Sequence, residues 1–250
     1  MAELLSTERD VVDLVPQLYD SENNNYPIKS LIEIRNYILM ADGIIRSQLR
    51  QVYGDNLTSG ITPWSKIPEP DEDNTGSASL APFITVSSSA ITEVWTLTFT
   101  SSTDYTIEGS ISGSQGTGST SSDSSSTNGY ITVPASKWSG TPASGDKFYI
   151  RVYDVEATLV ELSAKRAAAM ILDSVYTEFV PNQSEVARRL VEDVDEKLNR
   201  LIDPNFPDEL EVGRQGPNLD PIQMLPGYWV SDEGEDISKY ADDEFDVTTE

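Results

Sequence analysis

The chain has 250 residues, of which 38% are hydrophobic, enough for one good core or two modest ones. It contains neither Cys nor His, which excludes disulfides, thiol nucleophiles, imidazole bases, zinc sites built from Cys or His, and Ser-His-Asp triads. The 42 acidic and 17 basic residues give a formal net charge of -25. This charge argues against sequence-specific nucleic-acid binding and against anionic membranes as partners.

No stretch approaches about 18 consecutive apolar residues, the length that predicts a membrane span. Residues 1–13 also lack the basic and then apolar order of a signal peptide. We therefore expect a soluble chain with no membrane partner.

Two helices are predicted before residue 60. Ser6 and Thr7 are candidate N-caps for a short amphipathic helix that Pro16 weakens. Pro27 suits the first turn of a long helix that ends before Gly54. Its main apolar row has helical spacing and consists of Ile28, Leu31, Ile32, Ile38, Leu39, Ile45, Leu49 and Val52.

The long helix carries a second apolar row, made of Ile34, Tyr37, Ala41 and Ile44. A helix that is apolar on two sides is usually sandwiched between other elements. The second row therefore packs either inside the chain's own helical bundle or against a neighbouring subunit. The sequence leaves both alternatives open.

Composition then changes from helical to β-like. Residues 61–82, rich in Pro, Gly and acids, are assigned to a linker. Residues 83–153 are predicted to form an inserted small antiparallel β domain, with strands at 83–86, 94–99, 105–111, 130–133 and 147–152. Between Gly109 and Gly129, 17 of 21 residues are Ser, Thr or Gly, so an exposed, mobile loop is expected there.

Helical periodicity resumes after Asp154, and a second helix follows a capping box formed by Asn182 and Glu185. Because two helices cannot bury a two-sided apolar surface alone, the pairs before and after the β region should pack together. The predicted fold class is thus α+β: a four-helix bundle core from residues 1–60 and 154–204, with the β domain inserted.

Residues 205–250 are expected to form an extended acidic C-terminal arm. From residue 204 onward the chain has 13 acids and only two bases, Arg214 and Lys239. This composition fits a disordered tail, but also an arm that becomes ordered on a partner. The second alternative accounts for the many apolar residues, among them Leu219, Ile222, Met224, Leu225, Tyr228, Trp229, Tyr240 and Phe245.

Motifs for chemistry are weak, and we predict no catalytic, cofactor or metal site. Asp71, Asp73 and Gly76 match the opening of a calcium loop, but Pro82 stands where a bidentate Glu is needed. Glu192 and Glu196 lie one helical turn apart on a face that looks solvated. Three further residues, Gly113, Gly116 and Gly118, resemble a phosphate loop without a following helix.

The order of elements resembles that of the head-to-tail connector, or adaptor, proteins of tailed bacteriophages, with an added β domain. The resemblance covers about residues 5–205. It rests on the helix at 7–14, the long helix at 31–53, the Ala-rich helix around 165–169 and the last helix that leads to the arm. The segment from Trp138 through Asp154 resembles the β insertion that some of these proteins carry.

This resemblance implies a structural virion protein rather than an enzyme. The chain would be made in the host cytoplasm and would form a homo-oligomeric ring, commonly of twelve copies, beneath the portal protein. The ring would bind the next neck or tail-completion protein, and DNA would pass through its channel during genome ejection. The expected partner interface is Ile34, Tyr37, Ile44, Leu219, Ile222, Met224, Leu225, Tyr228 and Trp229.

Two other functions are kept open. The β domain could instead recognise a glycan or a capsid surface, with Trp95 and Trp138 as a sugar-stacking platform, although such residues usually fill a core. A hydrolase that uses two carboxylates would need both acids in one pocket.

Overall fold

The computed structural model describes residues 4–16, 30–54, 57–58, 60–82, 84–176, 184–203 and 210. Within these ranges the fold is α+β, with four α-helices and antiparallel sheets, which confirms the α+β part of the predicted fold class. The helices are α1 (Glu8–Leu14), α2 (Leu31–Tyr53), α3 (Ala157–Tyr176) and α4 (Ser184–Ile202). The longer strands are β5 (Glu93–Phe99), β6 (Asp104–Gly109), β7 (Gly113–Ser119) and β11 (Lys147–Tyr153).

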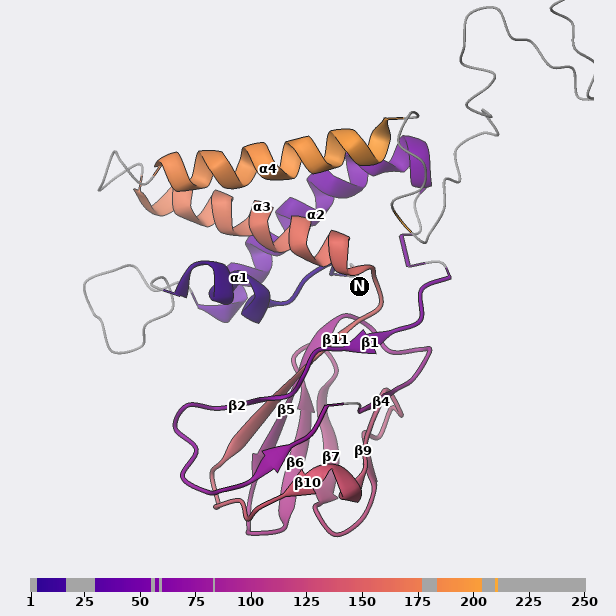
Figure 1. Cartoon of the computed structure of the whole chain (residues 1–250), viewed down its shortest axis with the longest axis vertical. Helices are drawn as coiled ribbons and strands as arrows, with labels where there is room; N and C mark the ends of the chain where they lie inside the picture. Colours follow the sequence, from indigo (N-terminus) through magenta and orange to yellow (C-terminus); the bar gives the residue numbers. More distant parts are fainter. Residues whose placement is uncertain are drawn as a thin grey trace, which may run out of the picture.

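The remaining strands have two or three residues each: β1 (Trp64–Ser65), β2 (Glu69–Pro70), β3 (Ser79–Leu80), β4 (Thr85–Val86), β8 (Ser124–Ser125), β9 (Ile131–Val133) and β10 (Trp138–Ser139). One 3₁₀ turn (Ala135–Lys137) precedes β10. Figure 1 shows the helices gathered on one side of the molecule and the strands on the other.

Local sequence explains where the first two helices begin. The backbone N–H and the hydroxyl of Thr7 both donate to the Asp10 carboxylate, at 2.9 and 2.7 Å. Ser30 and Glu33 form a capping box at the start of α2, and Gly54 ends that helix with φ 76°. The predicted start at Pro27 is therefore replaced by the cap at Ser30, while Pro27 itself lies outside the described residues.

Helices from the two ends of the chain pack on one another. One core cluster joins Val11 of α1, Ile38 of α2 and Ala168 of α3. A second joins Leu49 of α2, Leu159 of α3 and Leu198 of α4. Alanines at 164, 167, 168 and 169 allow close approach of α3 to its neighbours. Since α1 has only seven residues, the other three helices provide most of the helical layer.

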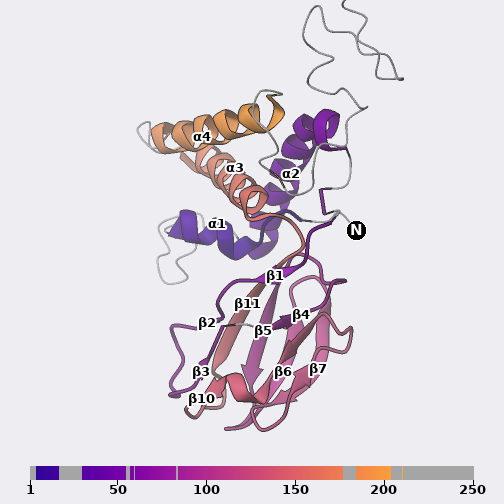
Figure 2. The ribbon, with the colours of Figure 1, turned by 45° about the vertical axis from the view of Figure 1, so that its right-hand side comes forward.

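The main sheet has the order β1-β11-β5-β6-β7, with β2 also paired to β11, and every pairing is antiparallel. Strands β4, β9 and β8 form a second sheet, and β10 pairs with β3. The β core lies between these layers and contains Trp95, Phe99, Tyr105 and Phe148, against which Trp138 packs. Figure 2 shows the β domain as a layered unit below the helices.

The expected linker at residues 61–82 differs from the structure. Strands β1 and β2 pair with β11, and β3 pairs with β10, so this segment is part of the β domain. Backbone N–H and C=O groups can pair in short strands even where side chains show no alternation. The proline in β2 is tolerated because that strand lies at a sheet edge.

The prediction of an exposed, mobile loop between Gly109 and Gly129 is wrong for much of that segment. Strand β7 pairs with β6, and β8 pairs with β9. Side-chain hydrogen bonds replace apolar packing here: Ser119 N–H donates to Ser124 Oγ at 2.9 Å, and Asn128 N–H donates to Gln115 Oε1 at 3.0 Å. Strand formation at an edge thus needs little apolar surface when polar groups satisfy one another.

Candidate partner interface and the helix-sheet joint

An apolar stripe runs along the outer face of α2. Ile32, Leu39 and Met40 are 72%, 37% and 56% exposed. Their spacing of seven and eight residues places them on one side of the helix, together with exposed Asn36 and Gly43. A Cβ added at Gly43 would meet no atom within 4 Å. These five residues, here named the α2 stripe, form a surface that is apolar apart from Asn36 and has open space beside its glycine.

The outer face of α4 is different. Arg188 forms ion pairs with Glu185 and Glu192, and Arg189 forms one with Glu185. Pairs of this kind, three or four residues apart, are typical of a helix face in contact with water. Of these two outer faces, that of α2 is the more apolar, and exposed apolar patches are often interaction sites.

The α2 residues predicted for the partner interface are buried or half-buried in the structure. Ile34 is 2% exposed and packs in the helical core, where Tyr37 is half-buried and donates its hydroxyl to Ser174 Oγ at 3.0 Å. Ile44 is also half-buried. The second apolar row therefore faces the chain's own helices, while Ile32 and Leu39, assigned to the main row, are exposed.

The six predicted arm residues, Leu219, Ile222, Met224, Leu225, Tyr228 and Trp229, lie outside the described residues. Sequence periodicity alone did not single out the α2 stripe, because α2 carries apolar residues on several faces. Gly43 in the middle of a predicted helix was the available signal, since glycine there costs stability and needs a reason.

Helix α1 is joined to the sheet by a buried polar cluster around Asp10. Its carboxylate accepts hydrogen bonds from Arg151 Nη1 at 2.9 Å, Lys66 Nζ at 2.6 Å and the Tyr153 hydroxyl at 2.8 Å. Burial alone would raise the pKa of Asp10, but hydrogen bonds from Lys66 and Thr7 hold it below its usual value. Asp10 is therefore ionised at neutral pH and binds two cations of the β domain.

Arg151 completes this joint. Besides Asp10 it contacts Asp13 of α1 and Glu69 of β2, and its side chain is almost fully buried. Burial acts against the charge of Arg151, but the hydrogen bond to Asp13 and the charges of Asp10 and Glu69 raise its pKa. A second link joins Arg35 of α2 to Glu8 of α1. Arg35 also donates to the Ser110 carbonyl, at 3.2 Å, so both helices hold the sheet in place.

The N-terminal segment is anchored by a buried carboxylate of α2. Asp42 accepts hydrogen bonds from Leu5 N–H at 2.9 Å and from the Ser163 hydroxyl at 2.5 Å. Ser6 Oγ lies 2.7 Å from Ser163 Oγ. Burial raises the pKa of Asp42 to about 6, although the hydrogen bonds from Ser163 and Leu5 and the charge of Arg46 act in the opposite direction.

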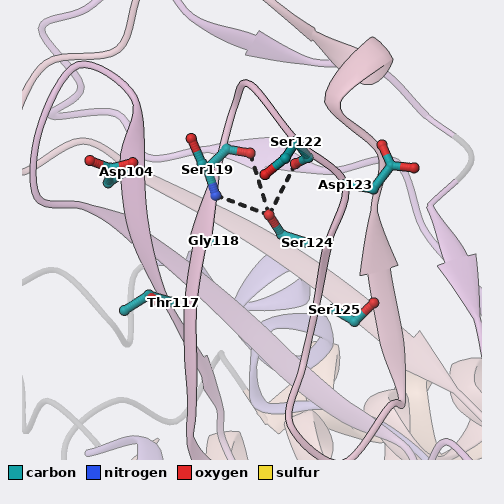
Figure 3. Close-up of a pocket in the computed structure, with 8 residues that line it drawn as sticks. All are labelled: Asp104, Thr117, Gly118, Ser119, Ser122, Asp123, Ser124 and Ser125. Atoms are coloured by element: carbon teal, nitrogen blue, oxygen red, sulfur yellow. Dashed lines mark hydrogen bonds between the residues drawn. The ribbon is translucent and has the colours of Figure 1, made fainter.

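A polar cavity of about 460 Å³ opens between β7 and β8. Figure 3 shows its lining, with Asp104 and Asp123 on opposite sides of Ser119 and Ser124. No aromatic side chain lines it. Trp95 and Trp138, the predicted sugar platform, pack instead in the β core, where the Trp138 ring lies 5.2 Å from those of Phe99 and Phe148. The glycan hypothesis thus loses the stacking surface on which it was based.

Residues of the apparent calcium loop form hydrogen bonds with other residues of the chain. Asp71, first residue of the apparent calcium loop, accepts hydrogen bonds from the Tyr149 hydroxyl and Asp73 N–H, and the hydrogen bond from Tyr149 keeps the pKa of Asp71 low. Gly76 N–H donates to Asp146 at 3.1 Å. Among the described residues there is no group of three or more His, Cys, Asp or Glu side chains that could hold a metal ion.

Within the described ranges, no helix combines the length and hydropathy that crossing a bilayer demands.

Comparison with known proteins gives no family. No family model matches the chain, and no curated protein matches it at a significant level. Two crystal structures of FlgL from Xanthomonas campestris, in space groups H3 and C2, align with 77% and 78% of this chain and 83% and 82% of their own. Their identities are 15% and 16% and their TM-scores 0.27 and 0.28. Similarity this low establishes neither a shared fold nor a shared function.

Proposed function

We propose that the chain is a structural adaptor subunit of the neck of a tailed bacteriophage, and not an enzyme. Copies form a ring, commonly of twelve, beneath the portal and join it to the next neck or tail-completion protein. The subunit is made in the host cytoplasm and resides in the virion at the head-to-tail interface. The observation that carries the proposal is the α2 stripe, an exposed apolar helix face on a unit built from both ends of the chain.

The helical unit is suited to be the ring-forming part. Helices α1 to α4 act as a four-helix core, from which the β domain projects as a rigid arm. The ionic joint supports this rigidity, because Asp10 of α1 pairs with Arg151 of β11 and with Lys66, which follows β1. Arg151 also pairs with Glu69 of β2. A ring needs a heterologous contact, in which one surface of a subunit meets a different surface of the next. The α2 stripe supplies one of these two surfaces.

The charge of the chain is compatible with DNA passage. A channel wall built from subunits with a net charge of -25 would repel DNA. DNA could then slide through the ring, whereas a basic wall would bind the phosphate backbone and hold it.

Electron microscopy of the purified full-length protein, alone and mixed with its portal, tests the proposal. We expect closed rings in at least one condition, and only small non-assembling species in both would refute it. Met40→Asp should abolish ring formation, because it places a charge on the α2 stripe. Ile67→Asp is the matched control: Ile67 is 67% exposed but belongs to the β domain, between β1 and β2. Equal loss of rings in both variants would exclude the stripe as the contact.

A further inference from the structure

The α2 stripe is an exposed apolar surface in the free subunit. Its residues Ile32, Leu39 and Met40 would promote non-specific association if nothing covered them before assembly. A segment of the same chain could prevent this, provided that it is apolar, long enough and anchored near α2. Residues 211–250 follow the last described residue and can be tested against these three conditions.

The first condition is the anchor. Leu210 is buried, with 2% exposure, in the core cluster that also contains Leu49 and Tyr53 of α2. The end of α4 lies beside the end of α2, since the Tyr53 hydroxyl donates to the Leu201 carbonyl at 3.0 Å. Leu210 therefore fixes one point of the C-terminal arm beside the C-terminal half of α2.

The second condition is reach. Met40 lies 13 residues before Tyr53, which is about 20 Å along a helix that rises 1.5 Å per residue. Residues 211–218, fully extended, span up to about 28 Å. The segment that begins at Leu219 can thus reach the α2 stripe of its own subunit.

The third condition is chemistry. Within residues 219–229 six side chains are apolar or aromatic: Leu219, Ile222, Met224, Leu225, Tyr228 and Trp229. Pro221 and Pro226 restrict the backbone to extended conformations, which lowers the entropy lost on docking. The second half of α2 also carries two basic residues, Arg46 and Arg50, while the chain beyond residue 204 is strongly acidic.

We propose that residues 219–229 cover the α2 stripe of their own subunit before assembly. A neighbouring subunit then displaces them during ring formation, a second step that rests on the proposed function. The segment protects the apolar face in the free subunit and slows premature oligomerisation.

The absence of Cys from the chain allows a direct test by crosslinking. The full-length double variant Met40→Cys/Leu225→Cys is treated with a short bis-maleimide, and the products are separated by denaturing electrophoresis and mapped by mass spectrometry. We expect an intramolecular product whose yield is unchanged over about a tenfold dilution, because a tethered segment has a concentration-independent local concentration. Ile67→Cys/Leu225→Cys is the control and should give at least severalfold less of this product.

Each other outcome overturns the proposal. Crosslinks mainly between chains would mean that the arm docks on a neighbouring copy, and equal yields in both double variants would mean that the arm has no preferred site. Met40 and Ile67 are exposed, so their substitution should leave the fold intact, and circular dichroism verifies this for both double variants. The displacement step has its own test: the crosslinked subunit should fail to form rings under conditions where unmodified protein forms them. If unmodified protein also forms none, the proposed function fails while the crosslinking result still stands.

Discussion

The buried Asp42 predicts an unusual pH dependence of stability. Its pKa is about 6 in the folded chain and 3.8 in an ordinary environment. A carboxyl whose folded pKa is raised favours folding in its protonated form. Its contribution is therefore fully present below pH 3.8 and is lost as the pH rises through about 6. The full contribution is about 3 kcal/mol, since each pKa unit corresponds to about 1.4 kcal/mol.

On acidification from pH 7 to pH 5, protonation of Asp42 should raise the free energy of unfolding by about 1.3 kcal/mol of this total. The substitution Asp42→Asn removes the titration but keeps an oxygen that can accept from Leu5 N–H. The Ser163 hydroxyl can then turn to accept a hydrogen bond from the new amide. We expect the free energy of unfolding of the natural chain to rise, relative to that of Asp42→Asn, by about 1.3 kcal/mol on acidification from pH 7 to pH 5.

Urea denaturation followed by tryptophan fluorescence at pH 7, 6 and 5 measures this difference. The comparison with Asp42→Asn is essential, because lowering the pH also weakens repulsion among the other acids of a chain with net charge -25. Glu196→Gln, on the exposed face of α4, serves as the control and should show the same pH profile as the natural chain. Parallel profiles for the natural chain and Asp42→Asn would refute the assignment of a buried, destabilised carboxylate.

Three further substitutions test the packing. Gly43→Ala should raise the free energy of unfolding by about 0.5–1 kcal/mol in chemical denaturation, because an alanine favours the helix and its Cβ has open space. Gly118→Ala should lower the melting temperature through a loss of about 1–3 kcal/mol, since its Cβ would lie 2.5 Å from the Tyr105 ring; a stability equal to that of the natural chain would contradict this packing. Arg151→Met should cost about 3–5 kcal/mol in urea titrations by leaving buried Asp10 with fewer partners, and a loss below 1 kcal/mol, roughly that of a surface pair, would show that the joint is not buried.

Local signals in the sequence predicted the mixed fold because they act over a few residues. Gly54 ends α2 as expected, and the strands predicted at 94–99 and 147–152 correspond to β5 and β11, which contribute side chains to the β core. The partners of β1, β2 and β7 could not be predicted in this way. Their pairing depends on backbone groups brought together by the rest of the sheet, and the Ser, Thr and Gly residues of β7 have no apolar alternation to reveal it.

The candidate interface, too, could be predicted only in part from the sequence. By itself the sequence determined that α2 is apolar on more than one face, that the chain lacks the side chains for imidazole or thiol chemistry, and that its surface must be acidic. Only the tertiary structure decided which face remains exposed. Packing of α3 buries Ile34 and its row, and so leaves Ile32, Leu39 and Met40 at the surface. The physical reason is that hydrophobicity gives each face the same tendency to be buried, whereas the limited number of helices allows only some faces to be covered.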